Sequence, residues 1–193
     1  MCETDKIAII GMDLRVRGAH SIEDFWRIIL QGESTLRHFT EAELIRKGVT
    51  PELRGNPQYS PVATKLDQSY DFDNDFFDIS AVEAAIMDPA QRVILESCYR
   101  ALENAAVAAT QAKSKLGVFV GNDGDYRQTT LVGSLSGEYG LLERLGNDAD
   151  FSSTRVANKL DATGPAVSVL AACATSLLAC LLYTSPSPRD KCR

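Results

Sequence analysis

The 193-residue sequence predicts an α/β fold, in which short buried strands alternate with helices along the chain. Three short apolar runs, at residues 7–11, 115–121 and 166–172, are typical of buried strands. Segments with helical periodicity and capping residues lie between them. Hydrophobic residues make up 45% of the chain, which is enough to form a packed core.

The first helix is predicted between Ser21 and Gly32. Ser21 is followed three residues later by Asp24, a spacing that resembles a capping box, and glycine commonly ends a helix. The apolar residues that recur at helical spacing, and that we expect to form one face, are Ile22, Phe25, Trp26, Ile29 and Leu30. This pattern predicts an amphipathic helix.

The middle of the chain predicts loops followed by two further helices. Residues 35–70 contain three prolines and are expected to form a short helix and loops. Ser80 is placed to cap a helix, and Pro89 is placed to begin a longer one. The candidate core positions of the longer helix are Val93, Leu95, Cys98 and Leu102. Residues 152–162 and 174–182 predict the last two helices, on either side of the third strand.

Charge and cysteine content exclude several classes of protein. The formal net charge of −6 leaves no Lys/Arg stripe to neutralise phosphates, so we expect no nucleic-acid partner. No apolar run reaches the roughly 20 residues that span a bilayer, so we expect no membrane segment. The five cysteines are an odd number without CxxC spacing, which argues against both a disulfide framework and a zinc site. We therefore expect a soluble, reduced, cytoplasmic protein, with an organelle not excluded.

Weak motifs elsewhere have plainer explanations. The run from Asp71 to Asp75 opens like a calcium loop but lacks the required glycine and glutamate, so we expect an acidic loop anchored by Phe72, Phe76 and Phe77. The stretch GNDGDY at residues 121–126 lacks the GxxxxGK of a phosphate loop. His20 and His38, the two histidines, have no second ligand at helical spacing and are expected at the surface.

Cys173 is the candidate nucleophile. It stands where the third predicted strand ends and the last helix begins, and the N–H groups and partial positive charge of a helix start favour a thiolate. Those N–H groups could also hold the oxyanion formed when the thiolate attacks a thioester. A hydrolase elbow is disfavoured, because Ala171 and Thr175 replace its two glycines. The alternative is that Cys173 is a small buried residue in an alanine-rich packing seam.

Four motifs in order resemble the β-ketoacyl synthase (ketosynthase) domain of type I polyketide and fatty acid synthases. They are IAIIGMDLRVRGAHSIEDFWRIILQGES, FDNDFFDISAVEAAIMDPAQRVILESCYRALENA, VFVGNDGDY and SSTRVANKLDATGPAVSVLAACATSLLA. The last one matches the segment that ends in the family's nucleophile motif, and its cysteine falls on Cys173. The motifs extend from Ile7 to Ala179.

The resemblance implies the first half of a thiolase-like layered α/β/α/β/α fold. It also implies that Cys173 accepts an acyl chain from the phosphopantetheine of an acyl carrier protein. A malonyl-type extender then loses CO₂ and attacks that thioester, in ordinary nucleophilic catalysis without a metal or redox cofactor. The family is usually homodimeric, so a second copy of the longer parent protein is an expected partner.

Departures from the family pattern leave a second function open. Leu170 stands where the family usually has Asp, Arg17 replaces a proline and Asp78 replaces a glycine. The family's two catalytic histidines follow the cysteine, and His20 and His38 cannot take their roles. The alternative is a ketosynthase-like domain that does not condense and instead binds acyl chains or scaffolds a dimer.

The C-terminal residues change in character. We expect residues 1–179 to be an incomplete ketosynthase N-terminal region and residues 180–193 to be a non-native tail. The tail begins CLLYTSPSPRD and resembles a sequencing-library transposon adapter translated in frame, although a Pro/Ser linker is the alternative. By this interpretation the parent protein is a complete condensing enzyme, and the 193-residue chain alone is inactive.

Overall fold

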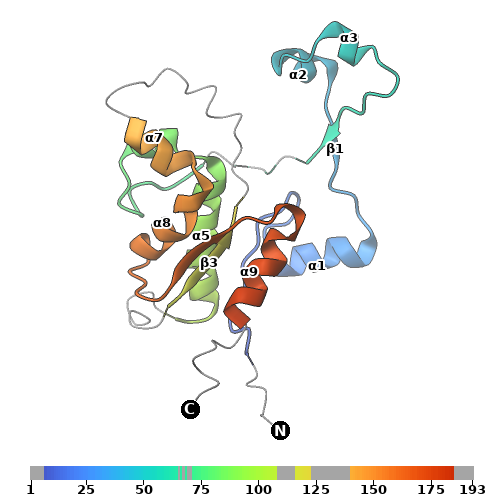
Figure 1. Ribbon diagram of the computed structural model, residues 1–193. Coiled ribbons are helices and arrows are strands. Elements are labelled where there is room, and N and C mark those ends of the chain that lie inside the picture. Colours follow the sequence, from blue (N-terminus) through green and yellow to red (C-terminus); the bar gives the residue numbers. More distant parts are fainter. Residues whose placement is uncertain are drawn as a thin grey trace. The chain divides into compact units, whose positions relative to one another are not determined.

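The computed structural model describes residues 7–64, 66, 68, 71–107, 116–122 and 140–184 (Figure 1). The chain divides into two compact units. The sheet unit consists of Met1–Asp13 and Ser69–Arg193, and the small unit consists of Leu14–Gln68. Each unit has its own elements and its own buried residues, so they are described in turn.

The sheet unit contains a parallel pair of strands with helices around it (Figure 1). Its elements in chain order are α4 (Ala81–Ile86), α5 (Pro89–Asn104), β3 (Val118–Gly121), α7 (Gly140–Asn147), the 3₁₀ turn η1 (Ala149–Phe151), α8 (Ser152–Lys159), β4 (Ala166–Val169), the 3₁₀ turn η2 (Ala172–Ala174) and α9 (Thr175–Thr184). β3 pairs with β4 in the register Val118 to Ala166 through Gly121 to Val169. The expected strands at 115–121 and 166–172 are thus confirmed.

The side chains of β3 alternate between two layers of helices, as the pleat of a strand requires. Val118 and Val120 are buried in the core cluster, which contains residues of α5 and α8. Phe119 instead lies beside Tyr183 of α9, with 6.3 Å between ring centroids, and Gly121 contacts Thr175 of the same helix. The sheet is therefore covered by α5 and α8 on one face and by α9 on the other.

The core cluster joins distant parts of the sequence. Its buried members are Phe77, Ile79, Ala84, Met87, Leu95, Val118, Val120, Val156 and Leu160. Leu95 has no exposed surface and Val156 has 1%, so each would lose all of its contact with water on folding. Of the predicted α5 positions, Cys98 and Leu102 pack against this cluster, and Val93 is half-buried.

The expected strand at residues 7–11 does not form. The segment has no strand hydrogen bonding, and Ile9 and Ile10 are 75% and 67% exposed. It is anchored through Gly11, which lies so close to the Ala101 carbonyl that a side chain would collide, and through the Met12 N–H, which donates to Asn104 Oδ1 at 3.0 Å. Its apolar composition predicts a strand, but a strand also needs a partner edge at the right distance, which composition alone cannot supply.

The small unit contains three helices and one antiparallel pair of two-residue strands among its described residues. Its elements are α1 (Ile22–Gln31), β1 (Arg37–His38), α2 (Glu41–Arg46), α3 (Pro51–Arg54) and β2 (Val62–Ala63). The limits of α1 are as predicted, because Ser21 accepts the Asp24 N–H and Gly32 adopts φ 64°. Within α1 Ile28 is buried, whereas Trp26, Ile29 and Leu30 of the predicted apolar face are exposed.

Capping residues set the starts of the helices in the sheet unit. The Ser80 hydroxyl accepts the Glu83 N–H at the start of α4, and Pro89 occupies the first turn of α5. In the acidic loop before them Phe77 is buried and Phe72 packs against the core, but Phe76 is 56% exposed, so its predicted anchoring is wrong. Phe76 instead makes edge contacts with Phe77 and Tyr99. In the described part of the chain, no helix is long and apolar enough to cross a membrane.

Candidate functional site

Cys173 lies in η2, the single turn of 3₁₀ helix between the end of β4 and the start of α9. Its side chain is exposed, as are the neighbouring Ala172 and Ala174. The packing-seam alternative is therefore wrong for this chain. The strand-to-helix turn presents the thiol at the carboxyl end of the sheet, where parallel α/β sheets commonly bind their ligands.

Thr175 holds this turn through its hydroxyl group. Thr175 Oγ1 accepts the Ala171 N–H at 2.9 Å and donates to the Ala172 carbonyl at 2.8 Å. The residue is buried at 8% exposure, against the end of β3. The two bonds therefore connect the first turn of α9 to the two residues that precede Cys173.

The N–H groups at the start of the helix are partly occupied. The Ala174 N–H donates to the Ala171 carbonyl at 3.0 Å, and the Thr175 N–H donates to the Ala172 carbonyl. Two of the N–H groups that the sequence offered for an oxyanion thus serve the turn itself. An oxyanion on a substrate bound at Cys173 needs other donors.

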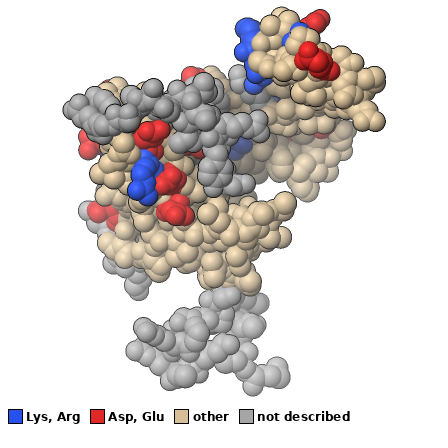
Figure 2. All heavy atoms as spheres, turned by 45° about the horizontal axis from the view of Figure 1, so that its top comes forward, with Lys and Arg blue, Asp and Glu red and all other residues tan. Residues whose placement is uncertain are grey.

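Small or apolar residues flank Cys173 in the sequence, and several of them are exposed. Leu170 is 52% exposed and Leu177 is 76% exposed, on either side of the turn. The face shown in Figure 2 carries few Lys or Arg side chains among its described residues, and most of its atoms belong to neither acidic nor basic residues. The two exposed leucines that flank the turn in the sequence are compatible with an acyl chain.

A buried polar cluster lies where β3 and β4 end. Asn122 donates to the Ser152 hydroxyl at 3.1 Å, and the Ser153 and Ser168 hydroxyls are 2.9 Å apart. Ser168 also donates to the Asp150 carbonyl at 2.9 Å. These bonds fix the start of α8 to the ends of both strands, because each buried hydroxyl needs a partner in place of water.

Arg155 of α8 ties four helices together. Its guanidinium donates to Gln91 Oε1 of α5 at 3.0 Å, to Glu83 Oε1 of α4 at 2.5 Å and to the Leu145 carbonyl of α7 at 3.0 Å. Gln91, only 1% exposed, donates in turn to the Asp148 carbonyl at 3.1 Å. The network holds helices α4, α5, α7 and α8 together, and its role is structural.

The other cysteines differ from Cys173 in their surroundings. Cys98 of α5 is half-buried, and burial, with a smaller effect of Asp13, raises the pKa of its thiol to about 11. Such a thiol is unreactive near neutral pH. Cys180 is exposed on α9, and the remaining two cysteines lie outside the described residues.

The histidines and the other weak motifs of the sequence form no metal-binding group among the described residues. His20 and His38 are both exposed in the small unit, as expected. Across residues 7–64, 66, 68, 71–107, 116–122 and 140–184, no group of three His, Cys, Asp or Glu side chains could hold a metal ion. Most of the GNDGDY stretch lies outside the described residues.

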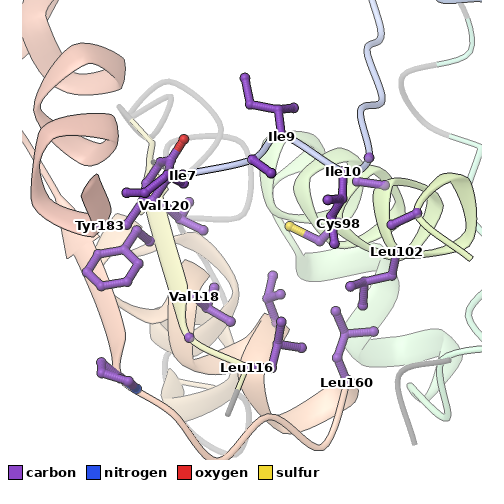
Figure 3. A pocket seen from close by; sticks show the side chains of 18 residues that line it. Ile7, Ile9, Ile10, Cys98, Leu102, Leu116, Val118, Val120, Leu160 and Tyr183 are labelled. Carbon is purple, nitrogen blue, oxygen red and sulfur yellow. The ribbon is translucent and has the colours of Figure 1, made fainter. Parts of the chain in front are cut away.

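An apolar hollow of about 710 Å³ lies beside β3 (Figure 3). Ile7, Ile9 and Ile10 line one side, and the other sides are formed by β3, by Cys98 and Leu102 of α5, by Leu160 and by Tyr183 (Figure 3). Cys173 does not line it. The hollow is therefore a gap along the unpaired edge of β3, separate from the candidate nucleophile.

The sequence analysis identified Cys173 but missed the residues that hold it. Thr175 lies within the recognised nucleophile motif, yet no pattern indicates that its hydroxyl bonds backward to residues 171 and 172. No sequence pattern singles out Arg155 or Gln91, and both are largely buried.

Comparison of this sequence with known proteins identifies its family. Residues 4–185 match the family profile described as the N-terminal domain of β-ketoacyl synthase. The pikromycin polyketide synthase component PikAII of Streptomyces venezuelae is 34% identical over 196 residues, covering 98% of this chain and 5% of that protein. A 6-methylsalicylic acid synthase of Arthrobotrys oligospora is also 34% identical, covering 91% of this chain and 10% of that protein.

Solved ketosynthases share the fold. The oxazolomycin ketosynthase domain OzmH KS7 of Streptomyces albus superposes with a TM-score of 0.74 at 26% identity, covering 92% of this chain and 32% of that one. Ketosynthase twelve of the bacillaene polyketide synthase of Bacillus amyloliquefaciens has a TM-score of 0.73 at 28% identity, with coverages of 84% and 28%. The chain thus spans about a third of these structures, and the likeness confirms the expected thiolase-like α/β fold. This chain belongs to the β-ketoacyl synthase family, whose N-terminal domain it matches.

Proposed function

We propose that this chain supplies the acyl-accepting part of a polyketide ketosynthase, and that its parent protein forms carbon–carbon bonds by decarboxylative Claisen condensation. The observation that carries the proposal is the exposed Cys173 on a strand-to-helix turn, inside the family match. The relatives named above are polyketide synthases, which favours a polyketide over a fatty acid product.

The proposed reaction has two steps. In the first, the Cys173 thiolate attacks the thioester carbonyl of an acyl chain on a carrier protein, and the carrier's phosphopantetheine thiolate leaves. In the second, a malonyl-type extender on a carrier loses CO₂, and the electron pair released forms the new bond to the acyl carbonyl while the Cys173 thiolate departs. Because decarboxylation supplies the electron pair, neither step needs a metal or a redox cofactor.

The proposal requires partners that the chain does not contain. An acyl carrier protein delivers both substrates, and we propose a homodimer for the parent protein and a cytoplasmic location. The histidine pair that activates the extender would lie after Cys173, since His20 and His38 precede it. Helix α9 continues to Thr184, and the family match continues to residue 185, beyond the proposed boundary at Ala179.

Sequencing the native transcript past the codon for Ala179 tests the proposed parent. We expect it to encode a continued ketosynthase with two downstream histidines in place of SPSPRD. If the transcript reads SPSPRD in frame, the proposed non-native tail is wrong.

Mass spectrometry tests the first chemical step. The protein, in the form that its native transcript encodes, is mixed with acyl-loaded carrier protein and digested, and each cysteine peptide is weighed. We expect an acyl adduct on the Cys173 peptide that is absent from Cys173→Ala and retained in Cys98→Ala, a control on the half-buried cysteine of α5. An adduct that persists in Cys173→Ala would refute the assignment.

A non-condensing domain that binds acyl chains or scaffolds a dimer is the second candidate. It is favoured by Leu170, which stands exposed where the family usually has an acidic residue. Release of CO₂ from a malonyl-loaded carrier separates the two candidates. A condensing enzyme releases CO₂ together with a lengthened acyl product, whereas a non-condensing domain gives at most the Cys173 adduct.

A further inference from the structure

We propose that Thr175 is a positioning residue for the Cys173 nucleophile. Gly121 of β3 allows this role, because its lack of a side chain leaves room for the Thr175 methyl group. The inference rests on the proposed function in that it treats Cys173 as the acyl acceptor. It goes further by assigning the geometry of the turn to one hydroxyl and one methyl group.

The hydroxyl of Thr175 serves the backbone on the N-terminal side of Cys173. It accepts the Ala171 N–H and donates to the Ala172 carbonyl, at 2.9 and 2.8 Å. A helix-capping threonine would instead accept an N–H two or three residues later in its own helix. The hydroxyl of Thr175 therefore restrains the turn that presents Cys173.

The turn needs this restraint because Ala172 adopts φ 48°. A residue with a Cβ atom avoids this left-handed conformation unless the surrounding structure enforces it. Ala172 immediately precedes Cys173, so its backbone angles determine where the Cys173 side chain points. Losing the two hydroxyl bonds would let Ala172 relax toward ordinary angles and move the thiol.

The methyl group of Thr175 fits against β3 at a place where only glycine is possible. A Cβ built on Gly121 would collide with Thr175 Cγ2, while Thr175 Cβ would remain 3.4 Å away. Gly121 also pairs with Val169 at the end of the sheet. The close approach thus connects the position of the turn to the parallel strand pair beneath it.

Two substitutions of Thr175 separate its functional groups. Thr175→Val keeps the methyl group and the shape but removes both hydrogen bonds, whereas Thr175→Ser keeps the hydroxyl and removes the methyl. We expect Thr175→Val to slow acyl transfer from a loaded carrier to Cys173 about tenfold or more, a size typical of lost buried hydrogen bonds. We expect Thr175→Ser to retain most of the rate. Equal rates for Thr175→Val and the unchanged protein would overturn the proposal, as would an equal loss in both variants.

Alkylation by iodoacetamide provides a readout that does not depend on acyl transfer. The 193-residue chain is used for this measurement, and its Cys180, exposed on α9 after the turn, serves as an internal control for folding and reagent access. We expect Thr175→Val to change the alkylation rate of Cys173 relative to Cys180 by at least about threefold, with Thr175→Ser near the unchanged ratio. If the unchanged protein takes no acyl group, the proposed function fails, and this ratio still decides the positioning role. An unchanged ratio in Thr175→Val would refute that role.

Gly121→Ala tests the contact between Gly121 and Thr175. We expect the alkylation rate of Cys173 relative to Cys180 in this variant to differ from that of the unchanged protein, because the added methyl group displaces Thr175. Combining Gly121→Ala with Thr175→Ser removes Thr175 Cγ2, the atom with which the new methyl group collides. We therefore expect the double variant to recover the ratio of the unchanged protein, so that the two substitutions are not additive. If the double variant is no better than Gly121→Ala, the Gly121 to Thr175 contact does not position the turn.

Discussion

The two units bury very different amounts of apolar surface. The sheet unit encloses a cluster that includes the fully buried Leu95, whereas the hydrophobic residues buried in the described part of the small unit are only Ala19, Ile28 and Leu44. The small unit depends more on local polar contacts, such as the reciprocal capping of α2 by Thr40 and Glu43. The turn that bears Cys173 therefore belongs to the unit with the larger core, since β3 contributes Val118 and Val120 to that core and Gly121 to the contact with Thr175.

Leu95→Ala should have the largest effect of the substitutions considered. It removes a side chain with no exposed surface from the centre of the cluster, and such losses typically cost about 2–5 kcal/mol. The matched control is Leu53→Ala in the small unit, where the side chain is 44% exposed and we expect a cost below about 1 kcal/mol. Denaturant unfolding of both variants measures the difference. Similar costs would show that the proposed contrast between the units is wrong.

Arg155→Met should have the next largest effect. It leaves the carboxylate of Glu83 and the amide oxygen of Gln91 without the guanidinium that bonds both, and we expect a loss of about 2–3 kcal/mol. Arg144→Met is the control, because Arg144 is 75% exposed and its 3.6 Å pair with Asp148 should contribute at most about 1 kcal/mol. Unfolding free energies compare the two. A loss for Arg155→Met no larger than for Arg144→Met would contradict a structural role for the network.

Local signals in the sequence predicted most of the described helices. Two of the three expected strands formed, and the short strands β1 and β2 were not predicted. The residues that begin or end a helix interact within one helical turn, so they can be recognised without knowledge of the fold. They are Ser21, Gly32, Ser80 and Pro89. The strand at residues 7–11 failed because pairing depends on distant residues. The identity of Cys173 came from a resemblance in its motif, not from periodicity.

Contacts between distant residues explain what the sequence could not predict. Thr175 meets Gly121 across 54 positions, the difference between their residue numbers, and Arg155 meets Glu83 across 72. The sequence also predicted the apolar face of α1 but not that Trp26, Ile29 and Leu30 on this face are exposed. Amphipathicity locates an apolar face but does not show that anything covers it.

Thr40→Ala should have a smaller and more local effect, in the small unit. It removes the hydroxyl that accepts the Glu43 N–H and should destabilise α2 by about 1 kcal/mol. Hydrogen exchange of the α2 amides measures this loss, while exchange at Leu95 in the sheet unit should not change. Ser60→Ala, an exposed substitution outside the helices, is the control and should leave α2 unaffected. Faster exchange throughout both units would contradict the separation between them.

Acid should loosen the same helix before it disturbs the core. The Thr40 N–H, then the Thr40 hydroxyl and more weakly Arg37, lower the pKa of the Glu43 carboxyl below its ordinary value of 4.5. Because the folded state holds the ionised form more tightly than the unfolded state, this stabilisation is complete above the ordinary value and is lost as pH falls through the lowered pKa. We expect protection of the α2 amides, measured by hydrogen exchange and corrected for intrinsic rates, to fall over that acid range. Glu43→Gln should remove the pH dependence, because a neutral amide does not titrate. A pH dependence that persists in Glu43→Gln would mean that another group controls α2.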